Sequence, residues 1–376
     1  MITSNQINDG LGPARVLLFS GRNIHEHEVW RCSFYEFEEL LRTIESVDVL
    51  APTPSRWYKN GKRLALRLGR HFRTPINPGV PVRKLTNNYE VFFAVCEKPS
   101  EILNVNAVTG WRDHCRTSFC LVTEFYAHEI PISQSCMEVL SRFDHVLFMF
   151  HTNQPFQKMI HGKGSYLPAG IDTLQFCPFP NPPPRSIDVL SIGRRSARTH
   201  QALLDLARKE DIFYIYDTIN DLHAYDLEQH RSLIANMARR SRYFLVNPGK
   251  IDLPEETGGQ SEFGYRYFEG AAPGTIMIGE TPRNDEFKKI FHWEDAVIPL
   301  PFGSDQIGAV IRSLDREPER QATIRSTNIT ESLLHHDWAY RWETVLELAN
   351  LSPLPQLLAR KQRLKELAEM AHEGIH

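Results

Sequence analysis

The chain of 376 residues lacks long apolar runs, paired cysteines and an apolar start. Its apolar runs, such as Val146 to Phe150, are far too short to cross a bilayer. The polar stretch from Met1 to Gly10 predicts no secretory signal. No Cys-x-x-Cys spacing occurs, so the cysteines indicate core thiols in a reducing compartment: Cys32, Cys96, Cys115, Cys120, Cys136 and Cys177. We therefore expect a cytoplasmic protein.

Acidic residues are absent from residues 51–89, although this segment carries nine cations: Arg56, Lys59, Lys62, Arg63, Arg67, Arg70, Arg73, Arg83 and Lys84. Large apolar residues recur within it at helical spacing, mostly opposite the cations: Trp57, Leu64, Leu68 and Phe72. The pattern predicts a basic amphipathic helix whose apolar stripe packs on the protein's own core. A second interpretation stays open, in which the helix lies peripherally on an anionic membrane or holds an anionic acceptor. No nucleic-acid partner is expected, because no helix-turn-helix, zinc or ribonucleoprotein signature accompanies the cations.

The length of the chain exceeds the usual size of one core and predicts two domains. Short apolar segments alternate with helical patterns, which is typical of parallel sheets with crossover helices and gives the fold class α/β. Strands are expected in the first half at residues 15–19, 47–50, 89–95, 119–123 and 145–150. After a Pro-rich linker at 178–184, strands are expected at 187–191, 212–216 and 243–246, and helices at 199–207 and 227–239.

The most informative motif, residues 262–280, reads Glu-Phe-Gly-Tyr-Arg-Tyr-Phe-Glu-Gly-Ala-Ala-Pro-Gly-Thr-Ile-Met-Ile-Gly-Glu. We expect a loop at Glu262, a short helix ending near Ala272 and a strand from Thr275 to Ile278. Small residues follow Glu269, which lets the backbone approach a ligand closely. A carboxylate pointing into a cleft accepts two hydroxyl hydrogen bonds at once, which suits a ribose diol. The alternative is an ordinary turn of an α/β protein, with Glu269 a solvated helix residue.

This motif resembles the C-terminal signature of GT-B nucleotide-sugar glycosyltransferases of the glycosyl-transferases-group-1 kind, including the spore-maturation-like branch with Arg-Tyr-Phe-Glu before small residues. The resemblance implies two Rossmann-like domains facing across a cleft. The acceptor domain would span residues 1–177 and the donor domain residues 178–350, and a C-terminal helix at 351–376 would pack back on the first domain.

The resemblance also implies roles for the two glutamates. In the family, two glutamates separated by seven residues straddle the donor, whereas six residues separate Glu262 and Glu269 here. Glu269 would bind the ribose. Glu262, one position out of register, would lie near the transferred sugar in a catalytic role.

A second motif, Ser191 to His200, predicts a phosphate site. A strand that ends in Gly193 and feeds a helix brings backbone amides and a positive helix end together. Three arginines surround that point, and guanidinium groups match phosphate oxygens: Arg194, Arg195 and Arg198. Family members have a Lys five residues after the Gly-Arg arginine. Thr199 stands at that position here, so Arg198 is expected to substitute for the lysine.

The remaining site predictions concern loops. The long loop after residues 243–246 is expected to close on the donor through Gly259, followed by Phe263, Gly264, Tyr265 and Arg266. Acceptor-side positions are expected after the first and fourth strands: Gly21, Arg22 and Glu124, with His128 in a catalytic role. His25 and His27 have no third ligand nearby in sequence and are interpreted as an ordinary loop, so no metal is expected.

The expected function is transfer of a hexosyl-type group from a nucleoside diphosphate sugar to an acceptor hydroxyl, without a metal or a cofactor. Retention of anomeric configuration is implied by the resemblance alone. Two alternatives stay open. One is a nucleotide-sugar epimerase of the same architecture; a phosphorylase is not expected, because the sequence has no Lys-centred pyridoxal phosphate signature. The other is a GT-B scaffold that binds a nucleotide or partner without catalysis, which the short glutamate spacing favours.

Overall fold

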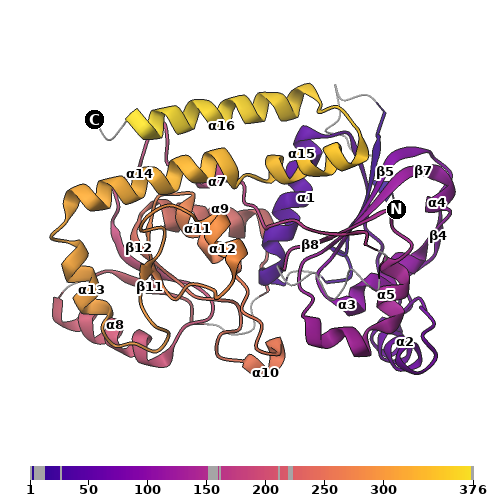
Figure 1. Cartoon of the computed structure of the whole chain (residues 1–376), viewed down its shortest axis with the longest axis horizontal. Coiled ribbons are helices and arrows are strands. Elements are labelled where there is room, and N and C mark those ends of the chain that lie inside the picture. Colours follow the sequence, from indigo (N-terminus) through magenta and orange to yellow (C-terminus); the bar gives the residue numbers. More distant parts are fainter. Residues whose placement is uncertain are drawn as a thin grey trace. The chain divides into compact units, whose positions relative to one another are not determined.

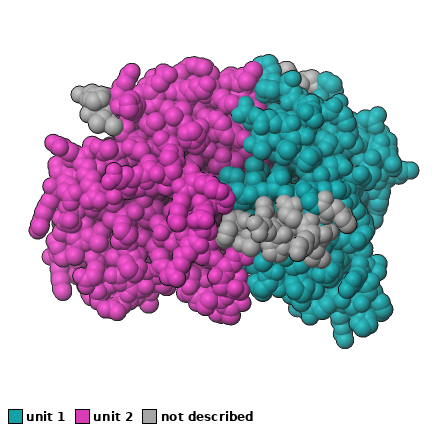
Figure 2. All heavy atoms as spheres, in the orientation of Figure 1, with its two compact units in different colours: residues 1–26, 38–168, 343–356 teal, residues 27–37, 169–342, 357–376 magenta. Residues whose placement is uncertain are grey.

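The computed structural model describes residues 2–3, 13–25, 28–150, 160, 162–210, 212–218 and 223–373. The chain forms two compact units (Figure 1, Figure 2). Unit 1 comprises residues 1–26, 38–168 and 343–356, and unit 2 comprises residues 27–37, 169–342 and 357–376. Each unit contains its own mainly parallel sheet.

Unit 1 is built on a seven-stranded sheet in the order β1-β3-β2-β5-β7-β8-β9. Its strands are β1 (Ile2–Thr3), β2 (Val16–Phe19), β3 (Val47–Leu50), β5 (Tyr89–Cys96), β7 (Cys115–Val122), β8 (His145–Phe148) and β9 (Gly164–Tyr166). Only the β1–β3 pair is antiparallel. The central strand β5 is buried along almost its whole length, as expected for a parallel strand covered on both faces.

Helices and a small two-stranded sheet surround this sheet. They are α2 (Tyr58–Phe72), α3 (Pro99–Ile102), α4 (Trp111–His114), α5 (Gln134–Leu140), the 3-10 helices η2 (Leu103–Ala107) and η3 (Ala127–Ile132), and strands β4 (Arg83–Lys84) and β6 (Val108–Thr109). Helix α1 (Cys32–Ile44) begins in the segment assigned to unit 2 and ends in unit 1.

Unit 2 is built on a five-stranded parallel sheet in the order β11-β10-β12-β13-β14. The strands are β10 (Ile187–Ser191), β11 (Tyr214–Tyr216), β12 (Ser241–Val246), β13 (Ile276–Gly279) and β14 (Ile298–Pro299). Its helices are η1 (Val29–Arg31), α7 (Thr173–Phe176), α8 (Ala197–Glu210), α9 (Leu227–Arg239), α10 (Pro254–Thr257), α11 (Arg266–Ala271), α12 (Asp285–Ile290), α13 (Ile307–Leu314), α14 (Pro318–His335) and α16 (Pro355–Glu373). Helix α15 (Trp338–Ala349) runs from unit 2 into unit 1.

Local chemistry explains where two helices of unit 2 begin. Asp226 caps α9, its carboxylate accepting a hydrogen bond from the backbone N–H of Gln229 at 3.0 Å. Asn284 caps α12 in the same way, accepting from the N–H of Phe287 at 2.7 Å. The α/β class and the expected helix at 227–239 are confirmed.

The C-terminal helix differs from expectation. Residues 343–356, which include most of α15, belong to unit 1, whereas 357–376 belong to unit 2. Leu364, Leu367 and Ala371 of α16 are buried in a cluster with residues of α14. The C-terminal segment that belongs to unit 1 is therefore residues 343–356, which include most of α15, and not α16. The apolar face of α16 instead packs on unit 2, because Leu364 and Leu367 are buried against residues of that unit.

Helix α2 also differs from expectation. The expected apolar stripe on the core is wrong, because Trp57, Leu64 and Phe72 are exposed and the helix packs inward through Tyr58, Ala65 and Gly69. Among the described helices, none combines the length and the apolarity needed to span a membrane.

Candidate functional site

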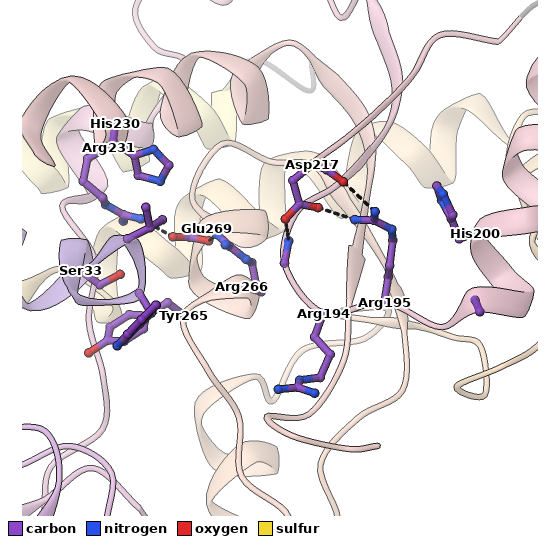
Figure 3. A pocket seen from close by; sticks show the side chains of 14 residues that line it. Ser33, Arg194, Arg195, His200, Asp217, His230, Arg231, Tyr265, Arg266 and Glu269 are labelled. Carbon is purple, nitrogen blue, oxygen red and sulfur yellow. Dashed lines mark hydrogen bonds and ion pairs between the residues drawn. The ribbon is translucent and has the colours of Figure 1, made fainter. Parts of the chain in front are cut away.

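A cavity of about 780 Å³ lies in unit 2, next to the carboxyl ends of the parallel strands β10 and β11 (Figure 3). Every residue that lines it belongs to unit 2: Val29, Trp30, Ser33, Gly193, Arg194, Arg195, Ala197, His200, Asp217, His230, Arg231, Tyr265, Arg266 and Glu269. Four arginines face two carboxylates in this lining, which makes the cavity suited to an anionic ligand.

The loop between β10 and α8 forms one wall of the cavity. Gly193 has a φ of 83°, a left-handed conformation that residues with a side chain rarely adopt. Its N–H donates a hydrogen bond to Oδ2 of Asp217 at 2.9 Å. Arg195 forms an ion pair with the same carboxylate and donates to the carbonyl oxygen of Asp217 at 2.6 Å. Asp217 therefore holds the loop in place from the end of β11.

The two other arginines of this motif differ in position. Arg194 lines the cavity, and its Nη1 lies 2.8 Å from a carboxylate oxygen of Asp252, with both side chains half-exposed. Arg198 does not line the cavity; it is exposed and forms an ion pair with Asp305 at 2.5 Å. The structure thus brings Gly193 and Arg194 together, as predicted, and leaves Arg198 outside.

Glu269 lies between two arginines, as Figure 3 shows. Its Oε1 pairs with Nη1 of Arg231 and its Oε2 with Nη1 of Arg266. Its side chain is 1% exposed, whereas that of Arg266 is 31% exposed. The interpretation of Glu269 as a solvated helix residue is therefore wrong. Arg266 is the partner that a ligand in the cavity can reach.

Arg231 comes from the buried face of α9 and is shared by two carboxylates. Its Nε donates to Oε2 of Glu36 at 2.7 Å while its Nη1 pairs with Glu269. Glu36 also accepts hydrogen bonds through Oε1, from the backbone N–H of Asp172 at 2.8 Å and from Nε1 of Trp338 at 3.0 Å. Through these bonds, Glu36 connects the 27–37 segment to Arg231, which lines the cavity.

The arginines decide the charge of Glu269. Burial alone raises the pKa of this carboxyl, but Arg266 and Arg231 outweigh burial and lower the pKa to about 2. Burial raises the pKa of Glu36, and Arg231 beside it only partly offsets this effect. Burial also lowers the pKa of His230 and of His200, and neighbouring arginines lower both further. Glu269 is therefore ionised near neutral pH, and the two histidines favour their uncharged forms.

The rest of the glutamate motif lies in several environments. Tyr265 and Arg266 line the cavity, but Gly259, Glu262, Phe263 and Gly264 do not. Glu262 is buried and accepts a hydrogen bond from Nε2 of Gln260 at 2.5 Å. Phe263 is buried in an aromatic cluster with Tyr267, Phe268, Phe287 and Phe291, because its ring packs into the core of unit 2. Gly259 follows α10 with a φ of 77°.

The predicted acceptor-side residues lie in unit 1. Arg22 follows β2 and pairs with Glu38 at 2.6 Å and also with Glu39. Burial lowers the pKa of Arg22, but the two glutamates outweigh it and raise the pKa overall. Glu124 is half-buried and His128 is exposed; both follow β7, and Gly21 precedes Arg22. Their roles stay predictions. His25 lies near Glu101, and His27 falls outside the described residues.

Sequence reasoning missed several lining residues. Asp217 directly follows a correctly predicted strand, a position at which polar residues of parallel sheets meet ligands. Arg231 shares the buried face of α9 with Ile234, Ala235 and Ala238, so an arginine in an apolar stripe was the available signal. No local signal marks Val29, Trp30 or Ser33, because only tertiary structure joins them to unit 2.

The chain is similar to a known protein family and to solved structures. Residues 211–347 match the family described as glycosyl transferase-like. The structure is similar to that of HepE from Anabaena, crystallised with UDP-glucose, with a TM-score of 0.50 and 11% identity over 89% of this chain and 99% of that one. The catalytic domain of starch synthase IV from Arabidopsis thaliana, bound to ADP and acarbose, has a TM-score of 0.44 and 10% identity over 77% and 75%. No curated protein matches the chain.

The likeness to HepE extends over nearly the whole of both chains and shows the fold. The predicted resemblance to the GT-B glycosyltransferases is confirmed by that fold and by the family match. The spore-maturation-like branch stays a prediction.

Proposed function

Because the chain has the GT-B fold and residues 211–347 match the glycosyl transferase-like family, we propose that it transfers a hexosyl-type sugar from a nucleoside diphosphate sugar to an acceptor hydroxyl. The observation that carries this proposal is the arginine-rich cavity of unit 2. Its volume of about 780 Å³ is within the usual range for small-molecule sites. HepE was crystallised with UDP-glucose, so a uridine donor is the first to test.

The diphosphate of the donor would lie against Arg194, Arg195 and the start of α8. The Arg194–Asp252 pair is half-exposed on both sides, and such pairs contribute little to stability, so a phosphate can replace Asp252 at small cost. The N-terminus of α8, a helix of 14 residues, adds its positive end. During transfer the bond between the anomeric carbon and the phosphate oxygen breaks, and charge builds on that oxygen, where these cations are most useful.

The ribose would bind Glu269 after one rearrangement. Both carboxylate oxygens are paired with arginines, and only Arg266 is substantially exposed. If Arg266 turns toward the diphosphate, Oε2 becomes available to a ribose hydroxyl while Arg231 keeps Oε1 in place. Arg266 would then take the part that the family gives to the missing lysine, in place of the Arg198 expected from the sequence.

The retaining and metal-independent character of the reaction is part of the proposal. Both described carboxylates that line the cavity, Asp217 and Glu269, are paired with arginines, so neither is presented as a nucleophile. This arrangement favours attack by the acceptor hydroxyl on the face that the diphosphate leaves. The hydroxyl oxygen bonds to the anomeric carbon, and its proton passes to the departing phosphate. Guanidinium groups would neutralise the phosphate charge in place of a metal ion.

The test is donor turnover measured beside donor binding. We expect a panel of nucleoside diphosphates to raise the melting temperature with a preference for one base, because a ligand that binds only the folded state stabilises it. The matching nucleoside diphosphate sugar should be hydrolysed slowly without acceptor, and chelation of divalent metals should not change the rate. Stabilisation by no member of the panel would contradict the donor site.

The non-catalytic scaffold is the second candidate, and the position of Glu262 favours it. Glu262 is buried, contacts Gln260 and does not line the cavity, so it is not positioned to contact a sugar bound there. A scaffold would be stabilised by the nucleoside diphosphate as strongly as an enzyme would. Intact donor after prolonged incubation with a mixture of acceptors would favour the scaffold.

A further inference from the structure

Helix α2 of unit 1 presents an unusual surface. Its buried residues are Tyr58, Ala65 and Gly69, and Leu66 packs against the core, whereas Trp57, Leu64 and Phe72 do not. Trp57, Leu64 and Phe72 are 60%, 57% and 64% exposed. In a surface helix of ordinary amphipathicity such side chains cover the core. Their exposure along one helix marks an interaction surface.

Close packing fixes this orientation. A side chain at Gly69 would place its Cβ 2.3 Å from Oγ of Ser135 on α5, and one at Gly61 would place it 2.4 Å from the carbonyl oxygen of Pro78. The hydroxyl of Tyr58 donates to Oδ1 of Asn104 at 3.1 Å. Helix α2 therefore cannot roll to bury its apolar stripe. Figure 1 shows it on the outside of unit 1, beside α5.

A row of cations runs beside the apolar stripe. At 100° per residue, Lys59, Arg63, Arg67 and Arg70 fall within one arc of about 80°, and Trp57, Leu64, Leu68 and Phe72 fall within a second arc of about 80° between the cations and the inward face. All four cations are exposed, and within the described part of the chain none makes an ion pair. The surrounding segment, residues 51–89, has no acidic residue. The surface is thus apolar and uniformly positive at once.

We propose that α2 docks unit 1 onto an anionic lipid membrane, lying in the plane of the interface. The cations would contact lipid phosphates, and Trp57, Leu64 and Phe72 would enter the boundary between headgroups and acyl chains. The charge of the surface selects an anionic partner, and the parallel apolar stripe selects one with an apolar interior. A dissolved polyanion would leave the stripe in water. The proposal does not depend on sugar transfer.

The test is co-sedimentation of the full chain with vesicles of phosphatidylcholine, with and without phosphatidylglycerol. We expect binding only to the anionic vesicles, weakened at high salt because exposed charges are screened. The variant Arg63→Glu/Arg67→Glu/Arg70→Glu should bind at least about 30-fold more weakly. The matched control reverses three exposed cations elsewhere, Arg208→Glu/Lys209→Glu/Lys365→Glu, and should bind like wild type.

A second variant separates insertion from charge attraction. Trp57→Ser/Leu64→Ser/Phe72→Ser keeps every cation, and we expect it to lose at least about tenfold in binding to anionic vesicles. In the wild type, anionic vesicles should shift Trp57 fluorescence to shorter wavelength, and Trp57→Phe should remove that shift. Unchanged melting temperatures would show that all variants fold.

Three results would overturn the proposal. Wild-type binding to neutral vesicles as tight as to anionic ones would remove the role of charge. Full binding by the apolar variant would show simple attraction to a polyanion. Binding to duplex DNA or heparin without binding to vesicles would assign the surface to a dissolved partner.

Discussion

At the residue scale, the candidate donor site depends on how charges are shared. Glu269 would be costly to bury alone, yet Arg231 and Arg266 reach it from two different helices and keep it ionised. Arg231 is neutralised in turn by Glu36. A residue selected from the sequence for binding a ligand therefore also has a structural role.

The first prediction follows from that structural role. Glu269→Gln should lower the free energy of unfolding at pH 7 by about 3 kcal/mol, because a pKa lowered from 4.5 to about 2 corresponds to that difference in interaction energy. Urea unfolding measures it. Glu255→Gln, at an exposed position on α10, is the control and should change stability by less than about 0.5 kcal/mol. If Glu269→Gln unfolds at the same urea concentration as the wild type, Glu269 does not have this structural role.

The wild type and Glu269→Gln should also differ in how their free energy of unfolding depends on pH. The folded pKa of Glu269 lies below its unfolded value, so its stabilising contribution is complete above about pH 4.5 and is lost as the pH falls toward about 2. The stability difference between wild type and Glu269→Gln should therefore be constant from pH 7 to about pH 5 and shrink below that. Unfolding curves at a series of pH values check this, and a constant difference down to pH 2.5 would contradict the low pKa.

Two neighbouring arginines allow a matched test of the phosphate site. Arg194 lines the cavity, whereas Arg198 lies outside it and pairs with Asp305. Arg194→Ala should weaken binding of a nucleoside diphosphate by about 1.5–3 kcal/mol, typical of a hydrogen bond to a charged group, and change nucleoside binding little. Arg198→Ala should change neither. Calorimetric titration compares them, and equal losses for both variants would move the phosphate site toward Arg198.

At the element scale, the position of a helix depends on which of its faces finds a partner. Helix α2 packs closely at two glycines and exposes Leu64 and Phe72, whereas α16 buries Leu357, Leu364 and Leu367 and exposes Leu358. Both helices have a leucine pattern that sequence reasoning assigns to a packed face. The two helices differ in whether another part of the protein packs over their leucine-bearing face.

A prediction for α16 follows. Leu364→Ala should lower the free energy of unfolding by about 2–5 kcal/mol, because Leu364 is fully buried in the cluster with Cys177, Ile329 and Leu333. Leu358→Ala on the same helix should cost less than about 0.5 kcal/mol, since that side chain is half exposed. Thermal and urea unfolding of the two variants measure the contrast. Equal effects would mean that α16 does not pack through Leu364.

At the scale of the whole molecule, unit 2 is not continuous in sequence. It takes residues 27–37 from the first tenth of the chain, and Glu36 in that segment neutralises Arg231. Glu36 also accepts hydrogen bonds from the N–H of Asp172 and from Nε1 of Trp338. A cut at residues 177/178, the boundary expected from the sequence, would remove this partner.

We therefore predict that a fragment of residues 178–376 is substantially less stable than unit 2 within the whole chain. Removing one partner of a buried ion pair costs about 3–5 kcal/mol, because the remaining charge is left uncompensated. Glu36→Ala in the full chain should reproduce part of this loss while leaving the rest of the segment in place. Hydrogen exchange of α9 amides is the measurement. Protection of α9 in the fragment equal to that in the full chain would contradict the role of residues 27–37.

The sequence by itself determined the α/β class and most strand positions, and it singled out the Gly193–Arg194 loop and Glu269, which line one cavity. These features depend on local periodicity, on strand-end positions and on short motifs, all of which involve residues close together in the chain. Tertiary structure alone decided that Glu269 is buried between two arginines, that Arg198 and Phe263 lie outside the cavity, and that α2 exposes its apolar stripe. The physical reason is that burial and ion pairing depend on which distant segments meet, and amino-acid spacing carries no record of that.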